Sequence, residues 1–67
     1  MKKRYENWYA LINCDTEIMP ITFSLGFLNN IEEAEKTMNI LIRERRKDLG
    51  ICKPYSIMNE SGIVKQF

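Results

Sequence analysis

The side chains best suited to chemistry in this sequence are two cysteines, Cys14 and Cys52, which lie far apart in the chain. No Cys-x-x-Cys spacing is present, so the sequence indicates neither a zinc site nor a dithiol redox motif. A disulfide between the two is one alternative. Because no secretory signal is recognisable, we expect two reduced, partly buried thiols instead.

Acid–base chemistry has a narrow basis, because the chain contains no histidine, the commonest general base and metal ligand. Asp15 and Glu17 are close enough to be considered as a carboxylate pair, but nothing supplies a partner base or a set of metal ligands. Acids in such a loop are usually solvated turn residues. The three glycines are too scattered for a phosphate-binding loop. We therefore expect no enzyme activity, no cofactor and no metal.

Basic side chains gather in two segments, one near the end of a predicted helix and one at the N-terminus. The members are Lys2, Lys3, Arg4, Arg43, Arg45, Arg46 and Lys47. Such a patch can bind phosphates or an acidic protein surface. Glu44 and Asp48 dilute it, and the formal net charge of the chain is only +1. Nucleic-acid binding is therefore the alternative hypothesis and not the leading one.

Aromatic residues and one apolar misfit supply further candidates for binding. Tyr5, Trp8 and Tyr9 share a predicted strand, where rings can stack on unpaired bases or anchor a protein interface. Trp8 and Tyr9 point to opposite faces, so at most one lies under the helix. Ile40 projects opposite the apolar helix stripe, either as an ordinary exposed isoleucine or as a contact for a partner or a second copy. The candidate protein-binding residues are Trp8, Tyr9, Ile40, Arg43 and Arg46.

Two strands in the first half of the chain must position these residues. Residues 4–14 alternate in a way that places Trp8, Ala10, Ile12 and Cys14 on one face. Residues 15–20 carry charges and a proline, which favours a loop. Residues 21–28 predict a second strand with one apolar face. The side chains of that face are Ile21, Phe23, Leu25 and Phe27.

A helix is predicted over residues 30–49, with Asn29 or Asn30 as its N-cap and Gly50 as its end. Its apolar stripe consists of Ile31, Ala34, Met38, Leu41, Ile42 and Leu49. Arg45 falls on that stripe, where its stem can lie over the edge of the core while the guanidinium reaches water. Residues 53–59 and 63–67 are predicted strands, and the four turn formers at their junction, residues 59–62, favour a hairpin. Pro54 is expected at the start of its strand or on an edge.

These elements predict a single α+β domain over residues 1–67, in the order β-β-α-β-β, with one helix packed on an antiparallel sheet of about four strands. At 67 residues a lone core supplies only about 3–5 kcal/mol, so a disulfide, a metal, self-association or a partner is a plausible aid. The apolar stripe of the helix is expected to pack on Ile21, Phe23 and Leu25.

The leading hypothesis is a noncatalytic protein-interaction module that acts by occupying the surface of a partner protein. The amino-acid usage and short length suit a small phage- or prophage-type regulator or inhibitor. A homodimer is a further alternative. Glu6 and Asn7 interrupt the first apolar stretch, so no signal or membrane-spanning segment is expected and the predicted location is cytoplasmic.

Overall fold

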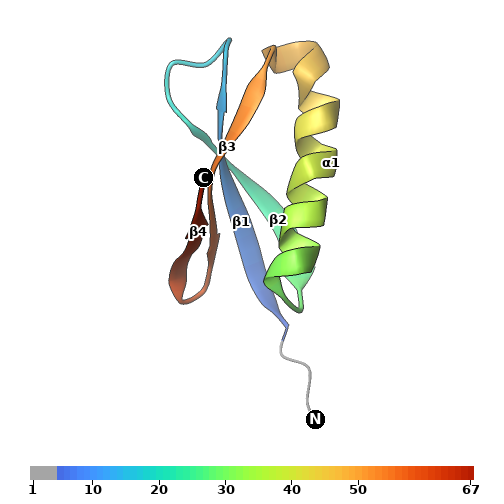
Figure 1. Cartoon of the computed structure of the whole chain (residues 1–67), viewed down its shortest axis with the longest axis vertical. Helices are drawn as coiled ribbons and strands as arrows, with labels where there is room; N and C mark the ends of the chain where they lie inside the picture. The colour runs from blue at the N-terminus through green and yellow to red at the C-terminus, as the bar shows by residue number, and fades with distance from the viewer. Residues whose placement is uncertain (1–4) are drawn as a thin grey trace.

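Two antiparallel hairpins and one helix make up residues 5–67, which are the residues described by the computed structural model (Figure 1). The strands are β1 (Glu6–Cys14), β2 (Ile21–Leu28), β3 (Cys52–Asn59) and β4 (Gly62–Gln66), and the helix is α1 (Ile31–Leu49). The sheet has the order β2-β1-β3-β4, and every neighbouring pair is antiparallel. The predicted fold class and element order are thus confirmed, while residue 4 of the first predicted strand lies outside the described residues.

The ends of α1 are fixed by local hydrogen bonds. The side chain of Asn30 accepts a hydrogen bond from the Glu33 amide at 2.9 Å, and the Glu33 carboxylate accepts one from the Asn29 amide at 3.4 Å. At the other end, the Gly50 amide donates to the Arg46 carbonyl at 3.2 Å. Gly50 has a φ of 78°, a conformation that glycine tolerates best. The N-cap is therefore Asn30, one of the two predicted asparagines.

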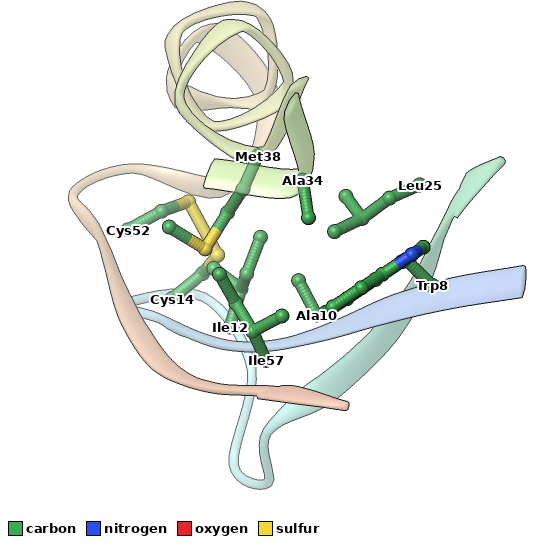
Figure 2. Close-up of a cluster of buried hydrophobic side chains, with 9 residues drawn as sticks. All are labelled: Trp8, Ala10, Ile12, Cys14, Leu25, Ala34, Met38, Cys52 and Ile57. Atoms are coloured by element: carbon green, nitrogen blue, oxygen red, sulfur yellow. A yellow bond between two sulfur atoms is a disulfide. The ribbon is translucent and has the colours of Figure 1, made fainter. Parts of the chain in front are cut away.

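The core lies between α1 and the sheet face beneath it (Figure 2). Its buried side chains come from β1, β2, α1 and β3. They are Trp8, Ala10, Ile12, Cys14, Leu25, Ala34, Met38, Cys52 and Ile57. The remaining members of the predicted helical stripe pack around Ala34 and Met38 and are partly buried. The helix thus uses the apolar face that its sequence periodicity predicts.

The predicted alternation along β2 is wrong beyond Leu25. Trp8 stands opposite Gly26, whereas Tyr9 stands opposite Ser24, so Leu25 is an extra residue in β2 and forms a β-bulge. Gly26 has a φ of 101°, which is accessible because it carries no Cβ. As a consequence Leu28 packs against the core, and Phe27, expected on the core face, is turned to the other side of the sheet and is 62% exposed.

The expectation of two reduced thiols is also wrong, because Cys14 and Cys52 form a disulfide. The two residues stand directly opposite each other on β1 and β3, with their Cα atoms 4.1 Å apart. Both are buried in the core under α1. Only the pairing of β1 with β3 brings these positions together, and no spacing in the sequence reveals that pairing.

The C-terminal hairpin is tighter than predicted. Glu60 and Ser61 alone form the turn, because Asn59 and Gly62 already pair with each other. The Asn59 side chain accepts a hydrogen bond from the Ser61 amide at 2.8 Å, which closes the turn. Pro54 lies near the start of β3, as its missing amide proton predicts.

Candidate functional site

The side of the sheet that faces away from α1 carries an uncovered group of apolar side chains. We call this side the open face. Antiparallel partners share a face, so the register places Tyr9, Met58 and Ile63 in one row across β1, β3 and β4. Leu11 lies on the same side of β1, two residues further along. Tyr9, Leu11 and Met58 are partly buried by their neighbours, while Ile63 is 58% exposed.

A stacked aromatic pair extends this group toward the β2 edge. Phe27 stands opposite Asn7, an open-face position of β1, and the Tyr5 and Phe27 rings stack with centroids 5.9 Å apart and planes at 19°. Offset ring stacking of this kind is favourable. Tyr5 is 47% exposed, so both rings remain accessible to solvent. We define the open-face patch as Tyr5, Tyr9, Leu11, Phe27, Met58 and Ile63.

Uncharged polar side chains border the open-face patch. They are Asn7, Asn13, Thr22, Ser24 and Gln66. Among the described residues, Lys53 is the charged residue that the strand register assigns to this face, and it lies at the far end, opposite Asn13. The open face therefore has an apolar centre and a mainly uncharged polar margin, with Lys53 at one end and the Glu60 carboxylate accepting a hydrogen bond from the Asn7 amide at 3.0 Å at the other. An apolar centre with a polar margin is the arrangement of a protein–protein interface.

The structure separates the two aromatic candidates of β1, as the alternation predicts. Trp8 lies under α1 and is 4% exposed, and its Nε1 donates a hydrogen bond to the Leu28 carbonyl at 3.2 Å. Tyr9 lies on the open face. Of these two candidates, Tyr9 is thus the residue that a partner can reach, whereas Trp8 holds the core together.

The candidates on α1 are exposed but do not form an apolar surface. Ile40 is 51% exposed. The residues three and four positions away on the same helix face are Lys36, Thr37, Arg43 and Glu44. Ile40 is therefore a single apolar residue among polar ones, which is ordinary for a protein surface. Arg43 and Arg46 are exposed on the same helix.

The basic end of α1 lies on the opposite layer of the molecule from the open-face patch. Arg45 is exposed, and its guanidinium lies 5.5 Å from the centre of the ring of Phe23, a side chain that packs against the core. Arg46 and Lys47 are exposed in the last turn, where cations favour the helix dipole. The other predicted members of the basic patch, Lys2, Lys3 and Arg4, lie outside the described residues.

Asp15, one of the two acids considered for catalysis, has a structural function. Its carboxylate accepts a hydrogen bond from the Ile51 amide at 3.2 Å, and its own amide donates to the Ile51 carbonyl at 3.1 Å. These contacts join the end of β1 to the segment between α1 and β3. Glu17 is exposed in the β1–β2 loop. The arrangement explains the presence of Asp15 by folding alone.

Sequence reasoning missed most of the open-face patch. Phe27 was expected in the core, and Leu11, Met58 and Ile63 were not considered as binding residues. One signal was available, because an isolated glycine inside an alternating strand often marks a bulge, and Gly26 is such a residue. The pairing of β3 and β4 with β1, which gathers the other residues, left no signal in the sequence.

Residues 5–67 are the part of the chain that the structure describes. This part of the chain shows no surface pocket and no group of three or more side chains suited to hold a metal ion. No helix within it has the length and apolarity needed to cross a membrane. Comparisons of the chain with models of protein families, with curated proteins and with solved structures gave no match in any of the three.

Proposed function

We propose that this protein is a noncatalytic protein-interaction module and that the open face of its sheet is the contact surface. The observation that carries the proposal is the open-face patch itself, an apolar group without a covering element among the described residues. Contiguous exposed apolar surface with a polar margin is typical of protein–protein contact sites.

The exposed rings alone provide a substantial driving force. An aromatic side chain has about 150–250 Å² of surface, and Tyr5 and Phe27 are 47% and 62% exposed. Together they offer about 200 Å² for burial, which corresponds to about 5 kcal/mol before the entropic cost of association is subtracted. Tyr9 and Ile63 add to this total. The patch can therefore serve as the central anchor of an interface.

The noncatalytic part of the proposal rests on the chemistry of the chain. It has no histidine to act as a general base near neutral pH, and the Asp15 carboxylate is bound to the backbone. Occlusion of a partner surface requires no reacting groups. This mode of action suits the small regulator or inhibitor of phage or prophage type that the sequence suggested.

The cytoplasmic location expected from the sequence is part of the same proposal. The Cys14–Cys52 disulfide argues against it, because disulfides persist mainly in oxidising compartments. The thiol state of the two cysteines in the source cells would decide between the cytoplasm and an oxidising compartment. Alkylation of intact cells with a thiol reagent, followed by mass measurement, reports that state directly.

The test of the function uses a photoreactive residue at two matched positions. Benzoylphenylalanine replaces Phe27 on the open face, or Ile40 on the outer face of α1, which is exposed to a similar degree. Irradiation in the source cells is expected to give a protein adduct from position 27 and little or none from position 40. No protein adduct at position 27 would contradict the proposal, and an adduct at position 40 alone would move the contact surface to the helix.

The nucleic-acid alternative has its own test, because the open-face rings and the basic helix end lie on different layers. Fluorescence anisotropy with labelled single-stranded and duplex oligonucleotides at physiological salt would detect binding. If the alternative holds, charge reversal of Arg43 and Arg46 abolishes binding and flattens its salt dependence. If the protein-interaction proposal holds, the wild-type chain shows no measurable affinity.

A further inference from the structure

The open face is electrically suited to contact with its own copy. Its central rows hold no charged side chain, and Lys53, at one end, is the charged residue that the register assigns to it. Two such faces can meet without repulsion between like charges. Among the described residues, a partner recognised by charge, such as a nucleic acid or an acidic protein, would find Lys53 alone as a complementary charge on this face, away from the open-face patch.

The size of the open face agrees with a small symmetric interface. The four strands hold 9, 8, 8 and 5 residues. At about 3.3 Å per residue and about 4.8 Å between strands, they give a flat area of about 480 Å². Side chains standing out from the sheet raise the accessible area above this value. Complete coverage therefore reaches the lower end of stable interfaces, at about 600 Å² from each partner.

We infer that the occupant of the open face is a second copy of this chain, packed face to face about a twofold axis. The inference rests on the proposed function, since it takes the open face as the contact surface. The two sheets would stack at about 10 Å with their strands aligned within about 30°, as in a β-sandwich. The open-face patch then becomes a second core. A chain of 67 residues, with nine buried core residues within the described range 5–67, needs such a core more than a larger domain does.

Tyr9 lies near the centre of this interface. It is on β1, one of the two middle strands, and in the row that continues through Met58 to Ile63. In a twofold arrangement, residues near the axis face their own counterparts. A charge placed at position 9 therefore meets an identical charge in the second copy.

The first measurement is the mass of the purified, oxidised chain by sedimentation equilibrium. A concentration series from about 1 µM to about 1 mM covers the micromolar dissociation constants expected of an interface this small. The apparent mass is expected to rise from 8.0 kDa toward twice that value. A mass of 8.0 kDa over the whole series would overturn the inference.

Substitutions at Tyr9 then locate the interface. Tyr9→Asp and Tyr9→Lys are each expected to weaken dimerisation by about tenfold or more, because like charges oppose each other. An equal mixture of the two variants is expected to recover the dimer. The matched control is Ile40→Asp on the outer face of α1, which should dimerise like the wild type. Dimerisation that survives Tyr9→Asp, or a mixture that stays monomeric, would overturn the packing about Tyr9.

A folding control and the photoadduct distinguish the possible results of these experiments. The emission of Trp8, the single tryptophan, reports whether each variant is folded, and Phe27→Ser replaces Tyr9→Asp if the latter unfolds. The photoadduct from position 27 distinguishes the two proposals. An adduct with a different protein, together with a monomeric chain, would overturn this inference and leave the proposed function standing. The absence of any protein adduct at position 27 would contradict the proposed function.

Discussion

Removal of the Cys14–Cys52 disulfide is expected to lower the free energy of unfolding by about 4 kcal/mol. The two residues are separated by 38 positions. A cross-link that closes a loop of this length removes about 13 cal/mol/K of conformational entropy from the unfolded chain. This entropy corresponds to about 4 kcal/mol at 25 °C. A lone core of this size supplies about 3–5 kcal/mol, so the disulfide contributes about as much as the core.

The same loss can be expressed as a shift in melting temperature. The entropy of unfolding is about 2.1 cal/mol/K per residue, which gives about 140 cal/mol/K for 67 residues. Dividing about 4 kcal/mol by this entropy predicts a fall in melting temperature of about 25–30 °C. Urea titration followed by Trp8 emission measures the free energy for the oxidised chain, the reduced chain and the Cys14→Ala/Cys52→Ala variant. Trp8 is a suitable probe because its side chain is only 4% exposed in the folded chain and becomes exposed on unfolding.

The double-alanine variant is also the control, since reductant should leave its stability unchanged. The reduced wild type and this variant are expected to agree within about 1–2 kcal/mol, because alanine also removes two buried sulfur atoms. A loss below about 1 kcal/mol on reduction would refute the entropic reasoning. Two free thiols in protein purified without reductant would refute the disulfide itself.

Two other substitutions test the strand geometry by the same titration, with the exposed Ser24→Ala as a control expected to stay within about 0.5 kcal/mol. Gly26→Ala should lower the free energy of unfolding by about 1–2 kcal/mol, because φ at this position is 101°. No atom lies within 4 Å of the added Cβ, so backbone strain is the whole effect. An unchanged stability would argue against the bulge. Ser56→Ala should raise the free energy of unfolding by about 1 kcal/mol, because the Ser56 hydroxyl is buried without a hydrogen-bond partner. A decrease of similar size would mean that the hydroxyl forms a hydrogen bond.

The local elements could be predicted from the sequence because each depends on neighbours a few residues away. Asn30 and Gly50 mark the ends of α1, and the helical repeat selects the face that meets the sheet. The two-residue repeat of β1 correctly separated Trp8 from Tyr9. This repeat shows that Trp8 and Tyr9 lie on opposite faces of the sheet. It does not show which of the two faces is covered by the helix.

The tertiary structure decided which distant residues meet. The disulfide and the row through Tyr9, Met58 and Ile63 both depend on the pairing of β1 with β3, two strands separated by the whole of α1. Strand pairing is a backbone interaction that any sequence can make, so its partner and register follow from the packing of the complete core.

The orientation of Phe27 was settled in the same way. A regular strand would have buried Phe27, whereas the bulge at Leu25 and Gly26 buries Leu28 and leaves Phe27 beside Tyr5. Gly26 permits the bulge, and the bulge places Leu25 in the core and Leu28 against it. The sequence by itself thus determined the helix, the strands and the absence of a histidine-based site, and the packing of those elements determined the disulfide and the apolar face on which the proposed function depends.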